Sequence, residues 1–327
     1  MGEKTLKELA QEELFKSLSK MSRDHFGAYL AMYSSWFGGI VKNPAFMMIP
    51  VDDHMVHRGD GVFEAIKCVN GNLYLFDRHI DRLLHSARAI NLNLPVSPEE
   101  LKGIVVETVR AGGARDAVVR IFVSRGPGGF SADPAESIGS QLYVVVTKPL
   151  TPPPEQYEKG VIAKRSKIPM KPSNMAHIKT CNYLHSVLMS MEARAEQVDF
   201  TISVDEDGCL GEGPTENIGI ITSSYEFLVP KFGKVLRGTT ISRAMELAKN
   251  LLKSKVLSRI AEECIPIEEV YRAHEVMLFG TTFDVLPVVK FDDRKIGSGQ
   301  PGPFYKKLLK LMREDMETNP DVSTPVF

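Results

Sequence analysis

The sequence predicts a two-domain α/β protein, and three observations support this fold class. The chain has 327 residues, which is more than one average domain. Stretches that alternate like strands are interspersed with stretches at helical spacing in both halves. The proline-rich run at 149–155 is the one clear break in composition. Because consecutive prolines hold a connector extended, we expect a linker there, between an N-terminal part (1–148) and a C-terminal part (156–327).

The composition points to small-molecule partners. Lys plus Arg total 40 and Asp plus Glu total 41, so no net field favours nucleic acid or a membrane surface. No apolar run approaches the roughly 20 residues that a membrane span needs, and no charged and then apolar leader opens the chain. We therefore expect a cytoplasmic location, and export is not expected.

The four cysteines, Cys68, Cys181, Cys209 and Cys264, are scattered along the chain. None of them belongs to a C-x-x-C pair. This spacing favours neither a zinc site nor a framework of disulfides, so we expect no metal ion. A reducing cytoplasm fits the pattern.

The N-terminal part combines helices with strands that we expect to form an antiparallel sheet. Asn70-Gly71 is a strong signal for a hairpin turn. Asp77 can cap the helix that follows the hairpin. The expected elements are an amphipathic helix at 3–21, an irregular aromatic segment at 26–48 that packs on the body or on a second subunit, strands at 62–66, 73–76, 117–124 and 142–147, and helices at 77–90 and 101–109.

Three arginines in this part are candidate ligand-binding residues, and each has an ordinary alternative. Arg82 lies in the first turns of its helix, where it can fork onto a phosphate or pair with a neighbour such as Asp81. Arg120 is the only charge in its apolar strand and needs either a substrate carboxylate or an internal acidic partner. Arg125 opens the glycine-rich segment 125–131, which is typical of an active-site loop.

Lys179 is the central candidate in the C-terminal part. It lies where a loop or strand end runs into a helix, since Val187, Leu188 and Met191 recur behind it at helical spacing. A lysine aimed from such a junction into a pocket loses hydration, which lowers its pKa and makes the amine a nucleophile toward a carbonyl. The alternative is an ordinary surface lysine.

Other candidates lie in turns beside strands or at helix starts. Glu212 lies between glycines ahead of an apolar strand, where its carboxylate can face inward or remain a solvated turn residue. Two Gly-Thr-Thr turns follow, and the amides of the first, at a helix start, form either an anion site or a plain cap. The threonines of these turns are Thr239, Thr240, Thr281 and Thr282.

Taken together, these candidates describe one ligand. An arginine and two Gly-Thr turns suit a phosphate, a glutamate suits a ring nitrogen, and a lysine suits an aldehyde. Pyridoxal 5′-phosphate carries all three groups. A carboxylate beside its pyridine nitrogen keeps that nitrogen protonated, so the ring can draw electrons from the α-carbon of a substrate. The residues therefore predict a pyridoxal-phosphate enzyme.

Five separated motifs resemble one family in wording and in order. They are G-D-G-V-F-E at 59–64, H-I-D-R-L at 79–83, I-K-T-C-N-Y-L at 178–184, E-G-P-T-E-N-I at 212–218, and the pair of G-T-T turns. Over roughly residues 50–316 the chain is similar to the fold-type IV (class IV) pyridoxal-phosphate aminotransferases. These include D-amino-acid transaminases, branched-chain aminotransferases and aminodeoxychorismate lyases. The segments at 55–59, 125–128 and 168–172 look most like plant-type D-amino-acid transaminases.

This resemblance implies a small N-terminal α/β domain, a larger, barrel-like α/β C-terminal domain, a cofactor between them, and a homodimer. It implies that Lys179 is the catalytic lysine and that Glu212 pairs with the pyridine nitrogen. The other cofactor-binding residues that it implies are Arg82, Asn217, Thr239, Thr240 and Thr281, and the substrate-binding residues are Phe63, Glu64, Arg120, Arg125 and Thr282.

The implied reaction moves an amino group between an amino acid and a 2-oxo acid, with glutamate and 2-oxoglutarate as the shared pair. Phe63-Glu64 matches transaminases, whereas lyases more often carry a hydroxyl residue in place of the glutamate. An aminodeoxychorismate lyase making 4-aminobenzoate remains an alternative, and a non-catalytic protein that binds the cofactor is another. Ile241, where an arginine usually follows the first Gly-Thr turn, departs from the common pattern. The hand of the substrate stays open.

Overall fold

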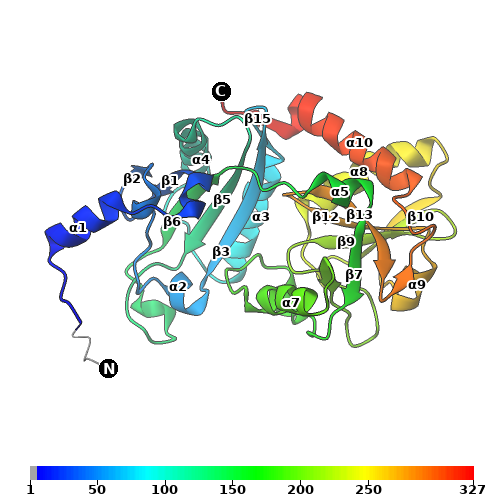
Figure 1. Cartoon of the computed structure of the whole chain (residues 1–327), viewed down its shortest axis with the longest axis horizontal. Coiled ribbons are helices and arrows are strands. Elements are labelled where there is room, and N and C mark those ends of the chain that lie inside the picture. Colours follow the sequence, from blue (N-terminus) through cyan, green and yellow to red (C-terminus); the bar gives the residue numbers. More distant parts are fainter. Residues whose placement is uncertain (1–5) are drawn as a thin grey trace.

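The computed structural model describes residues 6–327 and contains two β-sheets with helices packed against them (Figure 1). The first sheet has the order β15-β4-β3-β5-β6-β1-β2 and the second has the order β11-β10-β9-β12-β13-β7-β8, with β14 beside β13. The change from one sheet to the other falls between β6 and β7. This mixed architecture confirms the predicted α/β fold class, whereas a domain boundary at 149–155 remains a prediction.

Every neighbouring pair of strands in the first sheet is antiparallel. Asn70 and Gly71 form the predicted hairpin turn between β3 and β4, both with positive φ, of 51° and 84°. The strands are β1 (Tyr29–Ser34), β2 (Gly39–Val41), β3 (Gly61–Val69), β4 (Asn72–Tyr74), β5 (Ala117–Ser124), β6 (Gln141–Thr147) and β15 (Ser323–Pro325).

Helices α3 (Phe76–Ala89) and α4 (Pro98–Gly112) cover one face of this sheet. Val62 and Ile66 of β3 pack against these helices because alternate residues of a strand point to the same face. The predicted cap at Asp77 is wrong. Leu75, in the left-handed region at a φ of 55°, precedes α3, and no side chain caps the helix. Asp77 instead lies in the first turn and pairs with Lys102.

The second sheet mixes parallel and antiparallel pairs, and β13-β7, β7-β8 and β10-β11 are the parallel ones. Its strands are β7 (Val161–Arg165), β8 (Phe200–Ile202), β9 (Asn217–Ile221), β10 (Glu226–Pro230), β11 (Arg259–Glu263), β12 (Glu275–Gly280), β13 (Asp284–Phe291) and β14 (Arg294–Lys295). The accompanying helices are α5 (Pro154–Glu158), α6 (Ser173–Ala176), α7 (Leu184–Ala195), α8 (Thr239–Lys253), α9 (Ile267–Arg272) and α10 (Pro303–Thr318).

Strand β12 at the centre of the second sheet is buried along its whole length. Met277 and Phe279 pack with α8 and α10, while Val276 and Leu278 pack on the other side with Val270 of α9. Because both faces are covered, β12 is an almost continuous apolar run without polar alternation.

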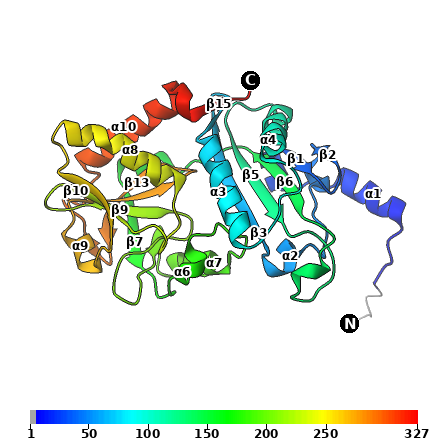
Figure 2. The ribbon, with the colours of Figure 1, turned by 180° about the vertical axis from the view of Figure 1, so that it is seen from behind.

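The two ends of the described chain contrast. The helix expected at 3–21 is observed as α1 (Gln11–Lys20), which projects away from the sheets in Figure 1, and residues 3–5 of that prediction lie outside the described residues. By contrast, β15 returns to the first sheet and pairs with β4 (Figure 2). The remaining helices are α2 (His54–Arg58) and the 3-10 turns Asp24–Ala28, Pro44–Phe46, Pro134–Glu136 and Pro320–Val322. Within residues 6–327, no helix has the length and apolar character that crossing a bilayer requires.

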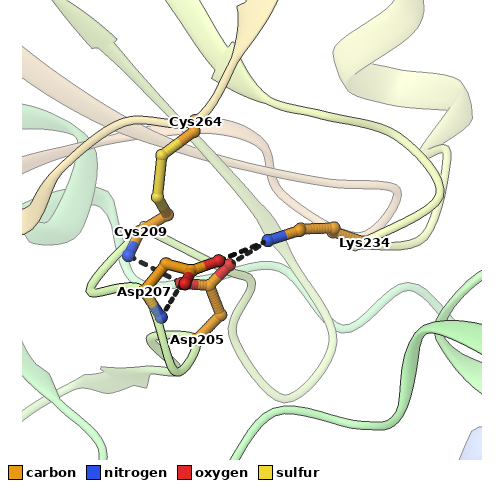
Figure 3. The surroundings of a disulfide bond; sticks show 5 residues. All are labelled: Asp205, Asp207, Cys209, Lys234 and Cys264. Carbon is orange, nitrogen blue, oxygen red and sulfur yellow. Dashed lines mark hydrogen bonds and ion pairs between the residues drawn. A yellow bond between two sulfur atoms is a disulfide. The ribbon is translucent and has the colours of Figure 1, made fainter.

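Cys209 and Cys264 form a disulfide, although the spacing of the cysteines did not favour a framework of disulfides (Figure 3). The two residues are 55 positions apart in the sequence, yet their Cα atoms are 5.4 Å apart. The segments that carry them run side by side, because the Leu210 N–H donates to the Ile265 carbonyl at 2.8 Å. Cysteine spacing alone gives no sign of this tertiary neighbourhood.

Candidate functional site

Lys179 lies between α6 and α7, and its backbone is tied to the first sheet. The Phe63 N–H donates to the Lys179 carbonyl at 3.0 Å, and the Cys181 N–H donates to the Gly61 carbonyl at 2.8 Å. The Lys179 N–H donates to Ser86 Oγ of α3 at 3.1 Å. These bonds bring a lysine from the C-terminal part to the start of β3, at a loop that runs into a helix.

The Lys179 amine is half-buried, and its Nζ lies 4.5 Å from the centre of the Phe63 ring. Burial, together with the positive charge of Arg82, lowers its pKa to about 8, although Glu64 and Glu212 oppose the shift. Among the described residues, no carboxylate forms an ion pair with Nζ. The amine is therefore far more often neutral near pH 8 than an exposed lysine.

Glu212 lines the same cavity as Lys179 and Asn217. Its Oε2 accepts the Leu236 N–H at 3.0 Å, and its Oε1 accepts Lys171 Nζ at 3.3 Å. Ser203 fixes the backbone of Glu212, because its Oγ accepts the Glu212 N–H at 3.1 Å and donates to the Glu212 carbonyl at 2.7 Å. The carboxylate is therefore held in one direction, toward the cavity.

Glu216 and Tyr183 also line this cavity, and sequence analysis did not single them out. Glu216 is 3% exposed. Its Oε2 accepts the Thr215 N–H at 3.0 Å and the Thr215 hydroxyl at 2.7 Å. Within the described chain its Oε1 has no partner. Burial raises the pKa of Glu216 to about 7, and the charge of Glu212 contributes. Glu216 lies within the motif at 212–218, which is a signal for it, but its burial comes from tertiary packing.

Arg82 and Glu64 form a buried, bidentate ion pair. Arg82 Nε donates to Glu64 Oε1 and Arg82 Nη2 to Oε2, both at 2.7 Å. His79 Nδ1 lies 2.6 Å from Glu64 Oε2, and its Nε2 lies 3.2 Å from the Thr239 hydroxyl. Burial lowers the pKa of His79, so the neutral ring donates to Glu64 and accepts from Thr239. Burial raises the pKa of Glu64, but the charge and hydrogen bonds of Arg82 outweigh burial and hold this pKa at about 2.

A second cavity, of about 560 Å³, lies over the start of α8 and shares Leu236 with the first. Arg82, Thr239 and Ser242 line it. No side chain caps α8, whose first amides lack intrahelical partners, and within the described residues Ser242 Oγ is buried without a partner. These donors suit an anion such as a phosphate.

Asn217 shapes the approach to this helix start. Its Nδ2 donates to the Leu236 carbonyl at 2.8 Å. A Cβ at Gly238 would lie 1.9 Å from Asn217 Oδ1, so any other residue there would displace the Asn217 amide. Thr240, in the first turn of α8, is buried.

Several predicted site residues lie outside the lining of both cavities. Glu64 is fully buried beneath Arg82, and Phe63 packs on Phe122 with ring centres 5.9 Å apart. Arg120 donates to the Thr147 hydroxyl at 3.0 Å. Thr281 and Thr282 lie in the turn between β12 and β13, and β12 pairs with β9 through Phe279 and Asn217.

Arg125 is engaged within the first sheet and α3. It contacts both carboxylate oxygens of Asp60 at 3.0 Å and the carbonyls of Ile90 and Asn91 at 2.9 and 2.8 Å. Its guanidinium therefore ties the glycine-rich loop to the end of α3.

Comparison with known proteins gives a consistent result. The model of the amino-transferase class IV family matches residues 61–291. A D-amino-acid transaminase, chloroplastic, of Arabidopsis thaliana is 39% identical over 296 residues, covering 89% of this chain and 78% of the relative. A putative branched-chain-amino-acid aminotransferase of Methanocaldococcus jannaschii is 31% identical over 268 residues, covering 81% of this chain and 90% of the relative. The solved structure of a T.th. branched-chain amino acid aminotransferase with pyridoxamine 5′-phosphate superposes with a TM-score of 0.84 at 25% identity, covering 91% of this chain and 99% of that one.

Proposed function

The chain belongs to the class IV aminotransferases, and we propose that within this family it acts on D-amino acids. It is an enzyme that moves an amino group between an amino acid and a 2-oxo acid, and it uses pyridoxal 5′-phosphate, as its family does. The observation that carries the choice of substrate is the 39% identity to a D-amino-acid transaminase over 89% of the chain.

The residues of the two cavities fit the cofactor. We assign Lys179 as the amine that binds its aldehyde, and Glu212 as the partner of its ring nitrogen. For the phosphate we assign the start of α8, where a buried Ser242 hydroxyl and uncapped amides are available beside Arg82. When bound, the cofactor supplies an electron sink for the substrate's α-carbon. Asn217, Thr239, Thr240 and Thr281 complete the proposed set of cofactor-binding residues.

Lys179 is suited to two tasks in this reaction. A half-buried amine with a pKa of about 8 provides a neutral nucleophile at a pH where an exposed lysine is almost fully protonated. The same amine can take up and return a proton near neutral pH. No ion pair holds Nζ among the described residues, so no salt bridge has to break when the amine reacts.

The substrate side of the site is aromatic. Phe63 stacks on Phe122, and the edge of Tyr183 meets Phe63 with ring centres 5.3 Å apart. This wall lies beside Lys179 Nζ and favours a small or apolar side chain on the substrate. It also favours the second candidate, a branched-chain amino-acid transaminase, which the 31% identity to the archaeal relative supports. We keep Glu64, Arg120, Arg125 and Thr282 as proposed substrate residues, with Glu64 and Arg125 acting through their internal partners.

Substrate panels distinguish these candidates. The purified enzyme is incubated with D-alanine, D-leucine, L-alanine or L-leucine, each with 2-oxoglutarate, and glutamate formation is measured. Turnover confined to the D-amino acids supports the proposal. Turnover with L-leucine alone would assign the branched-chain reaction instead, and pyruvate release from aminodeoxychorismate without a 2-oxo acid would indicate the lyase.

The assignment of Lys179 has its own test. Lys179→Ala should lower turnover at least about a thousandfold and abolish the visible absorbance of a covalently bound cofactor, because Lys171, the other lysine that lines this cavity, is paired with Glu212. Lys167→Ala, which removes an exposed lysine paired with Glu196, is the matched control and should behave as the wild type. Retention of the absorbance band in Lys179→Ala would refute the assignment.

We propose a homodimer in the cytoplasm. Large apolar side chains are exposed on α7, namely Leu184, Val187, Leu188 and Met191, and Trp36 and Phe37 are exposed between β1 and β2. Such clusters are typical of protein interfaces. Light scattering should give a molecular mass twice the 36.3 kDa of one chain.

The relative from Arabidopsis thaliana is named as chloroplastic, so cell fractionation is needed to test the proposed cytoplasmic location of this protein.

A further inference from the structure

Lys171 is a charged residue of the site that none of the assigned roles uses. It lies in the segment between β7 and α6 and lines the cavity that contains Lys179 and Glu212. It also lines a neighbouring cavity of about 420 Å³ beside Asp205, Asp207 and Lys234. Its side chain is 21% exposed and that of Glu212 is 13% exposed, so their contact at 3.3 Å is largely shielded from water.

Packing fixes the place of Lys171. A Cβ at Gly211 would lie 2.7 Å from Met170 Sδ, so the segment before Glu212 approaches the residue before Lys171 as closely as glycine permits. Prolines at positions 169 and 172 restrict the backbone on both sides of it. The amine is thus held beside Glu212 and is not an arbitrary surface contact.

The two oxygens of the Glu212 carboxylate have different partners. Glu212 Oε1 faces Lys171, while its Oε2 accepts a backbone N–H from Leu236. Lys171 also acts on Lys179, whose pKa it helps to lower. The other charged or ionisable groups around the two cavities are Glu64, Arg82, Tyr183, Glu216, Asp205, Glu206, Asp207 and Lys234.

We propose that Lys171 is a positioning residue that shares the Glu212 carboxylate with the ring nitrogen of the cofactor and thereby weakens the negative charge that Glu212 presents to the site. This inference rests on the proposed role of Glu212. A carboxylate oxygen has two acceptor positions, so Oε1 can receive Lys171 and a ring N–H together. Each cation then interacts with a partly neutralised carboxylate. Lys171 thus orients the Glu212 carboxylate and weakens its electrostatic attraction for the ring N–H.

Replacing the cation has a signed consequence for Lys179. Lys171→Met removes a positive charge near Lys179 and exposes the full negative charge of Glu212. Both changes favour the protonated form of the Lys179 nitrogen, so its titration midpoint should rise, by about one pH unit. Lys171→Arg keeps the charge and should leave the midpoint near that of the wild type.

The experiment measures this midpoint in two forms of the protein. In the holoenzyme, the pH at which the absorbance of the bound cofactor changes is recorded for wild type, Lys171→Met, Lys171→Gln, Lys171→Arg and the control Lys167→Met. In the cofactor-free protein, the pH dependence of Lys179 acylation is followed by mass spectrometry. We expect upward shifts in both forms for the methionine and glutamine variants alone.

The possible outcomes distinguish a failure of the proposed function from a failure of the role proposed for Lys171. A wild-type holoenzyme without the absorbance band would refute the proposed function. A normal band whose midpoint is unchanged in Lys171→Met and Lys171→Gln would overturn the role of Lys171 and leave the function standing. An equal shift in Lys167→Met would also overturn it, because the effect would then be one of net charge. If Lys171→Met fails to fold, Lys171→Gln decides.

Discussion

Two neighbouring clusters of ionisable groups differ in how completely their members are paired. In the first, the Glu64 carboxylate is fully buried and contacts Arg82 through both oxygens and His79 through one. In the second, Lys179 lacks an ion-pair partner and Glu216 has an oxygen without a partner, as far as the described residues go. The paired cluster holds the pKa of Glu64 at about 2, while the pKa values of Lys179 and Glu216 are shifted to about 8 and about 7.

This difference in pairing distinguishes residues that stabilise the fold from residues that can take part in the reaction. Groups whose hydrogen bonds are satisfied internally hold one charge state over most of the pH range, so they keep elements in place. Groups that burial leaves without partners titrate near neutral pH and can exchange protons or bind a ligand. Arg82 pairs with Glu64 and also lines the larger cavity, so it links the supporting cluster to the proposed phosphate site.

The largest expected effect tests the paired cluster. Glu64→Gln leaves the Arg82 charge without its partner and should cost about 3 to 5 kcal/mol of unfolding free energy in the cofactor-free protein, measured by urea denaturation. The control is Glu246→Gln, which disrupts pairs with Arg78 and Arg243 at a partly exposed site and should cost less than about 1 kcal/mol. Equal losses would contradict the contrast. Since the Glu64 pKa is lowered, its stabilisation is present above its ordinary value of 4.5 and is lost as the pH falls toward 2.

The next effect has the opposite sign. Lys179→Met should stabilise the cofactor-free protein at pH 7 by about 2 to 3 kcal/mol, because folding then no longer has to bury an amine that is protonated in the unfolded chain. The folded pKa of about 8 lies below the unfolded 10.5, so the gain is full below pH 8 and disappears as the pH rises to 10.5. Thermal unfolding across this range measures it, and Lys167→Met should show no such trend. A Lys179→Met variant that is less stable than the wild type at pH 7 would contradict the claim that burial of the Lys179 amine costs stability.

The smallest effect concerns Glu216. Its folded pKa lies above the ordinary 4.5, so its contribution to wild-type stability is full below pH 4.5 and falls as the pH rises through about 7. Glu216→Gln stays neutral and should be more stable than the wild type by about 2 kcal/mol at pH 8, while the two should match near pH 4. Urea denaturation at several pH values provides the comparison. If the unfolding free energies of the wild type and Glu216→Gln changed with pH in parallel, burial would not raise the pKa of Glu216.

Sequence patterns could predict the part of the site that is local in the chain. Lys179 at a loop-to-helix junction and Glu212 ahead of an apolar strand are recognisable from their neighbours, and both line one cavity. The fold class followed from the periodicity of strands and helices. The partners of Arg125 were not predictable, because Asp60 and the end of α3 meet it only in the folded sheet.

The disulfide and the burial of Glu216 were missed for the same reason. Cys209 and Cys264 become neighbours through the pairing of two segments that are distant in sequence, and no motif marks either residue. Glu216 resembles an ordinary polar residue before a strand, and only the packing around β9 removes it from water.

The return of β15 to β4 has a consequence for synthesis on the ribosome. The first sheet is built mainly from residues 29–147, yet its edge is closed by residues 323–325, and the Val326 N–H donates to the Gly71 carbonyl at 2.9 Å. While the intervening segments emerge, β4 presents an unpaired edge that a neighbouring nascent chain can join. Completion of the earliest sheet therefore waits for the latest strand, which couples the folding of the two halves.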